Sequence, residues 1–154
     1  MKTFQFRAEH WLPRPLDHVF PFFADAHNLE KLTPEWLRFD VLTPKPIPME
    51  VGTTIDYRLR WHGIPLRWTS EIAAWEPPHR FVDRQIRGPY RLWHHEHRFS
   101  EADDGTRMVD EVTYAVWGGD LANRLGVARD VQRIFDYRTR VLDELFGEAT
   151  ADSA

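Results

Sequence analysis

Alternating apolar and polar residues predict β-strands along most of the chain. In residues 54–61, Ile55, Tyr57, Leu59 and Trp61 fall on one side, and charged residues fall on the other. Because successive side chains of a strand point to opposite faces, this segment is predicted to be a strand with one buried face. The same pattern predicts six further strands, at residues 3–12, 39–42, 66–75, 106–117 and, on either side of a Gly-Pro turn, within 81–99.

Two short helices are predicted between the first and second strands. Residues 19–23 are rich in Phe, although Pro21 would cost about 3 kcal/mol inside a helix, so we expect a kink or a break there. Residues 28–37 predict a second short helix that runs into a turn. The three prolines of residues 43–52 indicate a rigid loop rather than a linker.

The apolar spacing changes to that of a helix from Leu121 onward. Three- and four-residue steps continue to Gly147, which is a typical helix stop. We expect the following residues to form the buried stripe: Leu121, Leu125, Ala128, Val131, Phe135, Arg138, Leu142 and Leu145. Residues 148–154 are small and polar, and we expect a disordered tail there.

This element order predicts a single α+β domain over residues 1–147. Consecutive strands with short turns form an antiparallel sheet, and a lone amphipathic helix must bury its apolar face against that sheet. We therefore expect a strongly curved antiparallel sheet of about seven strands wrapped around a long C-terminal helix, with two short helices after the first strand. A curved sheet of this kind leaves space for a cavity beneath the helix.

Composition narrows the possible functions. Aromatic residues make up 14% of the chain, which includes seven Trp and ten Phe, and this content fits a sheet wrapped around a cavity. The net charge of -4, without a basic stripe, argues against nucleic-acid binding. The absence of cysteine and of a long apolar segment predicts a cytoplasmic protein without membrane insertion, which we expect to be a monomer or a weak homodimer.

The most informative stretch is the strand within residues 92–99. Its alternation places Trp93, His95, His97 and Phe99 on one face, and the aromatic ends mark that face as buried. Two imidazoles thus enter an apolar interior, where polar groups need partners. A four-residue loop at 102–105 would place cross-strand partners at positions that sum to 207.

That register sets His97 opposite Asp110 and His95 opposite Val112. A carboxylate beside an imidazole raises the histidine pKa, so we expect the pKa of His97 to lie above its ordinary value near 6.5. The pair could act as an acid and base or bind a substrate, or it could be a salt bridge that only satisfies itself.

The register of residues 81–87 leaves two alternatives. A three-residue turn at 88–90 places Phe81, Asp83 and Gln85 inward, with Asp83 opposite His95. A two-residue turn buries Val82 and Ile86 instead. We favour the first arrangement because Phe81 is apolar.

Arg138 lies on the predicted helix stripe. Its guanidinium could pair with Asp110 or Asp83, could anchor a ligand, or could reach water at the helix edge. His95 and His97 together with Asp83 or Asp110 could also form a two-histidine, one-carboxylate metal site. No motif fixes a third ligand, so we predict no metal and no cofactor.

Four segments resemble the START/polyketide-cyclase/birch-allergen (SRPBCC, helix-grip) superfamily, and in particular an uncharacterised bacterial subgroup of ligand-binding members. They are residues 28–37 (NLEKLTPEWL), 75–89, 93–99 (WHHEHRF) and 135–138 (FDYR). The resemblance implies the helix-grip fold and a cavity for a hydrophobic small molecule. It does not imply a catalytic set, because the superfamily includes carriers, receptors and cyclases.

We therefore expect the protein to bind a lipid-, polyketide- or aromatic-like molecule between the sheet and the C-terminal helix. The alternative is a cyclase or dehydratase that uses His95, His97 and Asp110 as acid and base groups, and we favour binding over catalysis. The expected ligand-binding residues are Tyr57, Trp68, Asp83, Gln85, Trp93, His95, His97, Asp110, Tyr114, Phe135 and Arg138.

Overall fold

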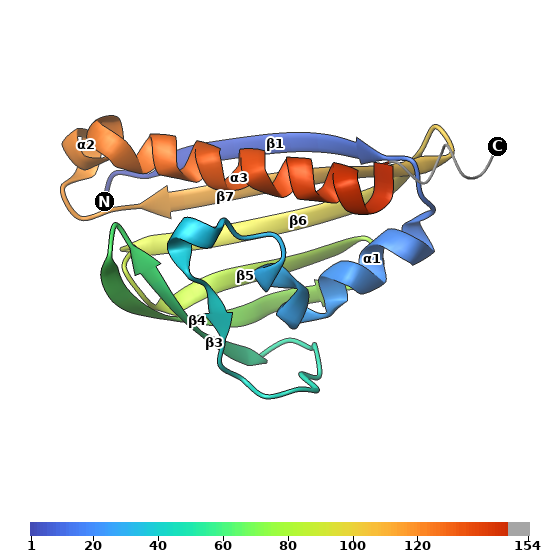
Figure 1. The fold of residues 1–154 in the computed structure, drawn as a ribbon, viewed down its shortest axis with the longest axis horizontal. Coiled ribbons are helices and arrows are strands. Elements are labelled where there is room, and N and C mark those ends of the chain that lie inside the picture. The colour runs from blue at the N-terminus through green and yellow to red at the C-terminus, as the bar shows by residue number, and fades with distance from the viewer. Residues whose placement is uncertain (148–154) are drawn as a thin grey trace.

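The computed structural model describes residues 1–147, so the predicted disordered tail lies outside the described residues. Its sheet contains seven antiparallel strands in the order β1-β7-β6-β5-β4-β3-β2. The strands are β1 Phe4–Leu12, β2 Asp40–Val41, β3 Thr54–Trp61, β4 Ile64–Glu76, β5 Arg80–Arg87, β6 Leu92–Ala102 and β7 Gly105–Ala115. The predicted fold class is confirmed: a long C-terminal helix runs along the β1 and β7 side of the curved sheet (Figure 1).

Short helical segments follow β1 as predicted. Helix α1 spans Leu16–Ala24 and contains Pro21 on its exposed side, within one nine-residue helix. The second predicted helix is instead two 3₁₀ turns, Ala26–Glu30 (η1) and Glu35–Leu37 (η2). Buried Phe20 and Phe23 of α1 pack on Phe99 with ring centroids 5.2 Å away, which closes one end of the sheet.

The C-terminal helix begins at Gly119 and runs to Gly147, with wider π-type turns near both ends. Its parts are α2 Gly119–Ala122, η3 Asn123–Val127, α3 Ala128–Leu142 and η4 Asp143–Gly147. The predicted stripe is right only in the middle, where Val131, Phe135, Arg138 and Leu142 are buried. Its other members, Leu121, Leu125, Ala128 and Leu145, are exposed. A π-type turn holds more residues than an α-turn, so side chains within or beyond it, here Leu121, Leu125 and Leu145, leave the buried face.

The two hairpins around β6 set the register of the interior. The β6–β7 turn is shorter than predicted, because Ala102 already pairs with Gly105, but it is centred at the same point. His97 therefore lies opposite Asp110, and His95 lies opposite Val112, as predicted. In β5, Asp83 lies opposite His95, and Ile86 is exposed. This agrees with the favoured arrangement, although Val82 is also buried.

No helix within residues 1–147 is both long enough and apolar enough to cross a membrane.

Replacing Phe135 with Ala should lower the free energy of unfolding by about 3–5 kcal/mol, because the buried ring packs on Phe6 with centroids 4.7 Å apart. Urea unfolding followed by circular dichroism would measure this loss. Exposed Leu125 supplies a control on the same helix, and its change to Ala should cost less than about 0.5 kcal/mol. Similar losses for the two variants would contradict the assignment of the buried helix face.

Candidate ligand-binding site

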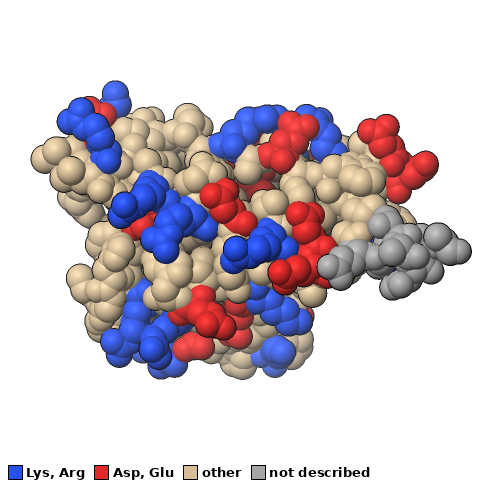
Figure 2. Space-filling model, turned by 45° about the horizontal axis from the view of Figure 1, so that its top comes forward, with Lys and Arg blue, Asp and Glu red and all other residues tan. Residues whose placement is uncertain are grey.

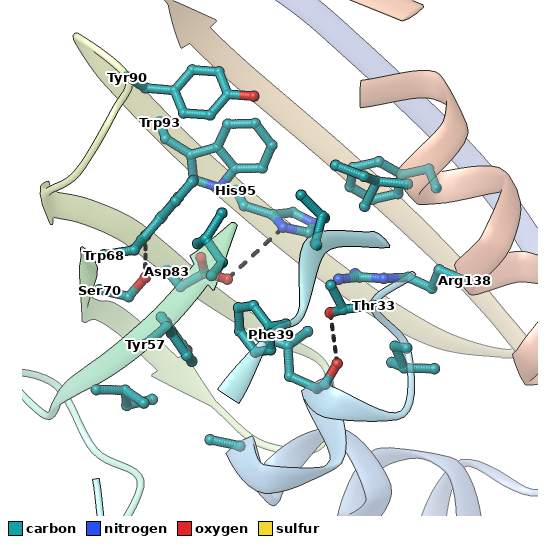
Figure 3. A pocket seen from close by; sticks show the side chains of 18 of the residues that line it. Thr33, Phe39, Tyr57, Trp68, Ser70, Asp83, Tyr90, Trp93, His95 and Arg138 are labelled. Atoms are coloured by element: carbon teal, nitrogen blue, oxygen red, sulfur yellow. Dashed lines mark hydrogen bonds and ion pairs between the residues drawn. The ribbon is translucent and has the colours of Figure 1, made fainter. Parts of the chain in front are cut away.

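A cavity of about 400 Å³ lies between the sheet and the C-terminal helix, and apolar side chains form most of its lining. Eight of the eleven predicted residues line it: Tyr57, Trp68, Asp83, Trp93, His95, His97, Phe135 and Arg138. In Figure 3, Trp68, Tyr90 and Trp93 stand on one side of the cavity, with His95 near its centre and Arg138 opposite. The cavity thus has an aromatic wall and a polar wall.

The aromatic wall is built by strands β4 and β6 and by the turn between β5 and β6. The Trp68 and Trp93 rings meet edge to face with centroids 5.5 Å apart, and Tyr90 lies 4.8 Å from Trp93. Trp68 donates a hydrogen bond from Nε1 to Ser70 Oγ at 3.0 Å, which fixes the orientation of its indole ring. Tyr57 lies on the floor of the cavity, and burial raises the pKa of its hydroxyl well above the ordinary value.

The polar wall contains two stacked imidazoles between two carboxylates. The His95 and His97 rings are 3.6 Å apart at an angle of 23°, and His97 also stacks on Phe81 at 4.0 Å. His95 Nε2 lies 2.7 Å from Asp110 Oδ1, and His97 Nε2 lies 2.6 Å from Asp83 Oδ2. Because carboxylates accept hydrogen bonds, both Nε2 atoms carry the protons of these bonds.

Each histidine therefore bonds to the aspartate that is not directly opposite it. The expected pairing of His97 with Asp110 is a longer contact, 3.4 Å from Nδ1, and His95 Nδ1 lies 3.9 Å from Asp83 Oδ2. The backbone register decides which Cβ atoms face each other, but the side-chain torsions decide where the ends of the side chains meet. With the two rings stacked, each Nε2 points toward the aspartate that is not the cross-strand neighbour of its histidine.

The expected rise in the pKa of His97 is wrong. Burial and the neighbouring His95 lower the pKa of His97 to about 4, although Asp83 and Asp110 act in the opposite direction. Burial alone would raise the pKa values of Asp83 and Asp110. The hydrogen bonds from the histidines and the nearby positive charge of Arg138 outweigh it and hold both pKa values below their ordinary range.

Arg138 joins the same group from helix α3. Its side chain is buried, with Nη1 3.8 Å from Asp110 Oδ1 and the guanidinium 4.9 Å from the Phe135 ring. The alternative in which its head reaches water is therefore wrong. Its Nε atom is buried without a hydrogen-bond partner.

Three predicted residues are not among those that line the cavity. Gln85 donates to the backbone oxygen of Tyr90 and accepts from its nitrogen, which holds the β5–β6 turn in place. Tyr114 donates its hydroxyl to Asn123 Oδ1 at 2.6 Å and so ties β7 to the C-terminal helix. Asp110 lies behind His95 and acts on the cavity through that ring.

Asp130 lines the cavity but was missed by the sequence analysis. It is buried on α3, where its Oδ2 accepts a hydrogen bond from Trp61 Nε1 at 2.9 Å and lies 3.1 Å from His62 Nε2. The sequence signal that could have identified Asp130 is its four-residue spacing from Ile134 and of Ile134 from Arg138. At this spacing the three residues lie on one helix face, and all three line the cavity.

Asp83, His95 and His97 also offer three possible metal-ligand atoms within 4.8 Å of one another. The imidazoles are stacked face to face, and each Nε2 is already bonded to a carboxylate. The guanidinium of Arg138 adds positive charge nearby, which disfavours a cation at this position. The geometry favours a hydrogen-bonded network, and the absence of a metal stays a prediction.

The comparisons with known proteins agree with this fold. Residues 12–136 match the family model described as polyketide cyclase / dehydrase and lipid transport. The chain therefore belongs to this family, within the helix-grip superfamily that the sequence resembles. A search of curated proteins returned no match.

Solved structures share the fold at low sequence identity. Protein Ms6760 from Mycobacterium smegmatis is 19% identical with a TM-score of 0.69, and the alignment covers 92% of this chain and 89% of that one. Ara h 8.0201 is 14% identical with a TM-score of 0.70, over 93% and 97% of the two chains. The Zhui aromatase/cyclase from Streptomyces sp. R1128 is 15% identical with a TM-score of 0.70, over 96% of each chain.

The His97 resonances should titrate with a midpoint near pH 4 in NMR spectra. The folded pKa lies below the ordinary value of 6.5, so the contribution of neutral His97 to stability is complete above pH 6.5. It is then lost as the pH falls toward 4, by about 3 kcal/mol for a shift of this size. The His97→Ala variant assigns the resonances, and a midpoint above pH 6 would contradict this environment.

Proposed function

We propose that this protein binds a small hydrophobic, ring-containing molecule in the cavity between the sheet and the C-terminal helix. The observation that carries this proposal is the cavity of about 400 Å³, with an aromatic wall on one side and one compact group of polar side chains on the other. Small-molecule sites are typically apolar hollows with a few well-placed polar groups. Membership in the polyketide cyclase / dehydrase and lipid transport family supports the same function.

The aromatic wall favours rings over flexible chains. Trp68, Tyr90 and Trp93 meet at edge-to-face and tilted angles, so they offer ring faces and edges that an aromatic ligand can contact. Each contact between two aromatic rings contributes about 0.5–1.5 kcal/mol of stabilisation, in addition to the contribution from the apolar area that is buried. The opposite wall would then orient the polar atoms of the ligand, because Arg138 and the two histidines line the cavity as well.

A second candidate is a cyclase or dehydratase that acts on a polyketide-like substrate. The specific observation in its favour is His97, whose lowered pKa leaves the imidazole neutral near pH 7. Its Nδ1 is buried without a hydrogen-bond partner, and Asp83 holds Nε2. A neutral imidazole oriented by a carboxylate can accept a proton, and a pKa of about 4 makes His97 a weak base near pH 7. Ligand binding needs fewer assumptions, and it precedes any such reaction.

The expectations about partners remain part of this proposal: a monomer or weak homodimer that neither binds nucleic acid nor inserts into membranes, and a cytoplasmic location. On the face drawn in Figure 2, the basic side chains are interspersed with acidic ones, so they do not form one continuous basic surface there. This mixed charge supports a small molecule, rather than nucleic acid, as the partner.

The neutral fluorescent dye Prodan, a naphthalene with a ketone, should bind to the wild-type protein with a blue-shifted emission and saturable quenching of tryptophan. Changing Trp68 to Leu should weaken this binding roughly 3- to 10-fold, because one face of the aromatic wall is lost.

Trp11 provides the matched control for this experiment. It lies on β1 with 42% of its surface exposed and is not among the cavity residues, so Trp11→Leu should leave the affinity unchanged. Absence of saturable binding, or equal losses in the two variants, would contradict ligand binding at this cavity.

A further inference from the structure

The cavity has a second polar position, at Asp130, apart from the histidine and arginine group. Asp130 and Arg138 both lie on α3 and both line the cavity. Their positions differ by eight residues, which corresponds to about 12 Å along a helix. Ile134 lies midway between them and also lines the cavity. The helix therefore presents an acceptor, an apolar residue and a donor in a row.

Each end of this row has a buried polar atom without a partner. Within residues 1–147, only three buried side-chain nitrogen or oxygen atoms lack a hydrogen bond: Asp130 Oδ1, Arg138 Nε and His97 Nδ1. The last of these belongs to strand β6 and lies 3.4 Å from Asp110 Oδ1, whereas the other two belong to helix α3. An unpaired buried polar group costs about 1–3 kcal/mol, so two such atoms on one cavity-lining helix face call for an explanation.

Anchoring of the β3–β4 turn does not account for the Asp130 carboxylate. Both contacts to this turn, from Trp61 Nε1 and His62 Nε2, use Oδ2 alone. The side chain is only 4% exposed, so bulk water does not solvate the other oxygen. Oδ1 can thus accept a hydrogen bond from a molecule inside the cavity.

We propose that the ligand carries polar groups at two ends. A hydroxyl or amine donates to Asp130 Oδ1, a carbonyl or hydroxyl oxygen accepts from Arg138 Nε, and an apolar ring system spans the roughly 12 Å between them. This inference rests on the proposed ligand binding and adds a specificity to it. A ligand with a carboxylate at the Asp130 end is disfavoured, because its oxygens and Asp130 Oδ1 would all be hydrogen-bond acceptors.

Calorimetric titration with three rigid biphenyls tests this arrangement. 4-Acetyl-4′-hydroxybiphenyl has both polar ends, its 4′-methyl ether lacks the donor, and 4-hydroxybiphenyl lacks the acceptor. The wild-type protein should bind the first at least about ten-fold more tightly than either of the others, because each missing hydrogen bond leaves a charged group unpaired.

Two variants assign these preferences to residues. Asp130→Asn should reduce the preference for the phenol over its methyl ether to within about two-fold, because an amide can donate to either oxygen. Arg138→Met should remove the preference for the acetyl group. Asp136→Asn is the matched control, because this exposed carboxylate on the same helix accepts a hydrogen bond from Gln132 and is not among the residues that line the cavity.

The outcomes separate this inference from the proposed function. Saturable binding of all three probes with equal affinities in the wild-type protein would overturn the two-ended ligand and leave cavity binding intact. A phenol preference that persists in a folded Asp130→Asn variant would overturn the role of Asp130. Failure of every probe to bind would overturn cavity binding itself, and this inference with it. The comparison of the three biphenyls uses only the wild-type protein, so this test does not depend on the folding of any variant.

Discussion

Asp83 on β5, Asp110 on β7, two histidines on the strand β6 between them and one arginine from the helix share the interior of this protein. None of these groups would be stable there alone, because an unpaired charge in an apolar surrounding is strongly disfavoured. His95 and His97 stack on each other and bond to Asp110 and Asp83, and Arg138 supplies the positive charge beside Asp110. The packing of α3 on the sheet thus depends on a polar contact as well as an apolar one.

This constraint also shapes the cavity. The histidines, the aspartates and the arginine must stay close together because they satisfy one another, so this group occupies one wall and leaves the facing wall to Trp68, Tyr90 and Trp93. Burial keeps His97 neutral near pH 7, and its Nδ1 has no hydrogen-bond partner. Binding and acid–base chemistry would therefore draw on one arrangement, which fits a family whose description includes cyclases, dehydrases and lipid transport.

The sequence predicts the fold and much of the candidate site, because strand alternation and turn length are local properties. A centre between Asp103 and Asp104 is enough to place His97 opposite Asp110. The hydrogen-bond partners of the histidines could not be predicted in this way, because they depend on side-chain torsions and on ring stacking. The ends of the helix stripe failed for a related reason: the π-type turns that expose Leu121 and Leu125 leave no mark in apolar spacing.

Fluorine NMR of protein labelled with 5-fluorotryptophan, titrated with 4-acetylbiphenyl, tests most directly whether a ligand enters between the sheet and the helix. We expect the Trp68 and Trp93 resonances to shift together and reach saturation, because both indoles line the cavity, while the Trp11 resonance stays in place. Single Trp→Phe variants assign the resonances. Unchanged Trp68 and Trp93 resonances alongside a moving Trp11 resonance would place any binding on the outer surface and contradict ligand entry between the sheet and the helix.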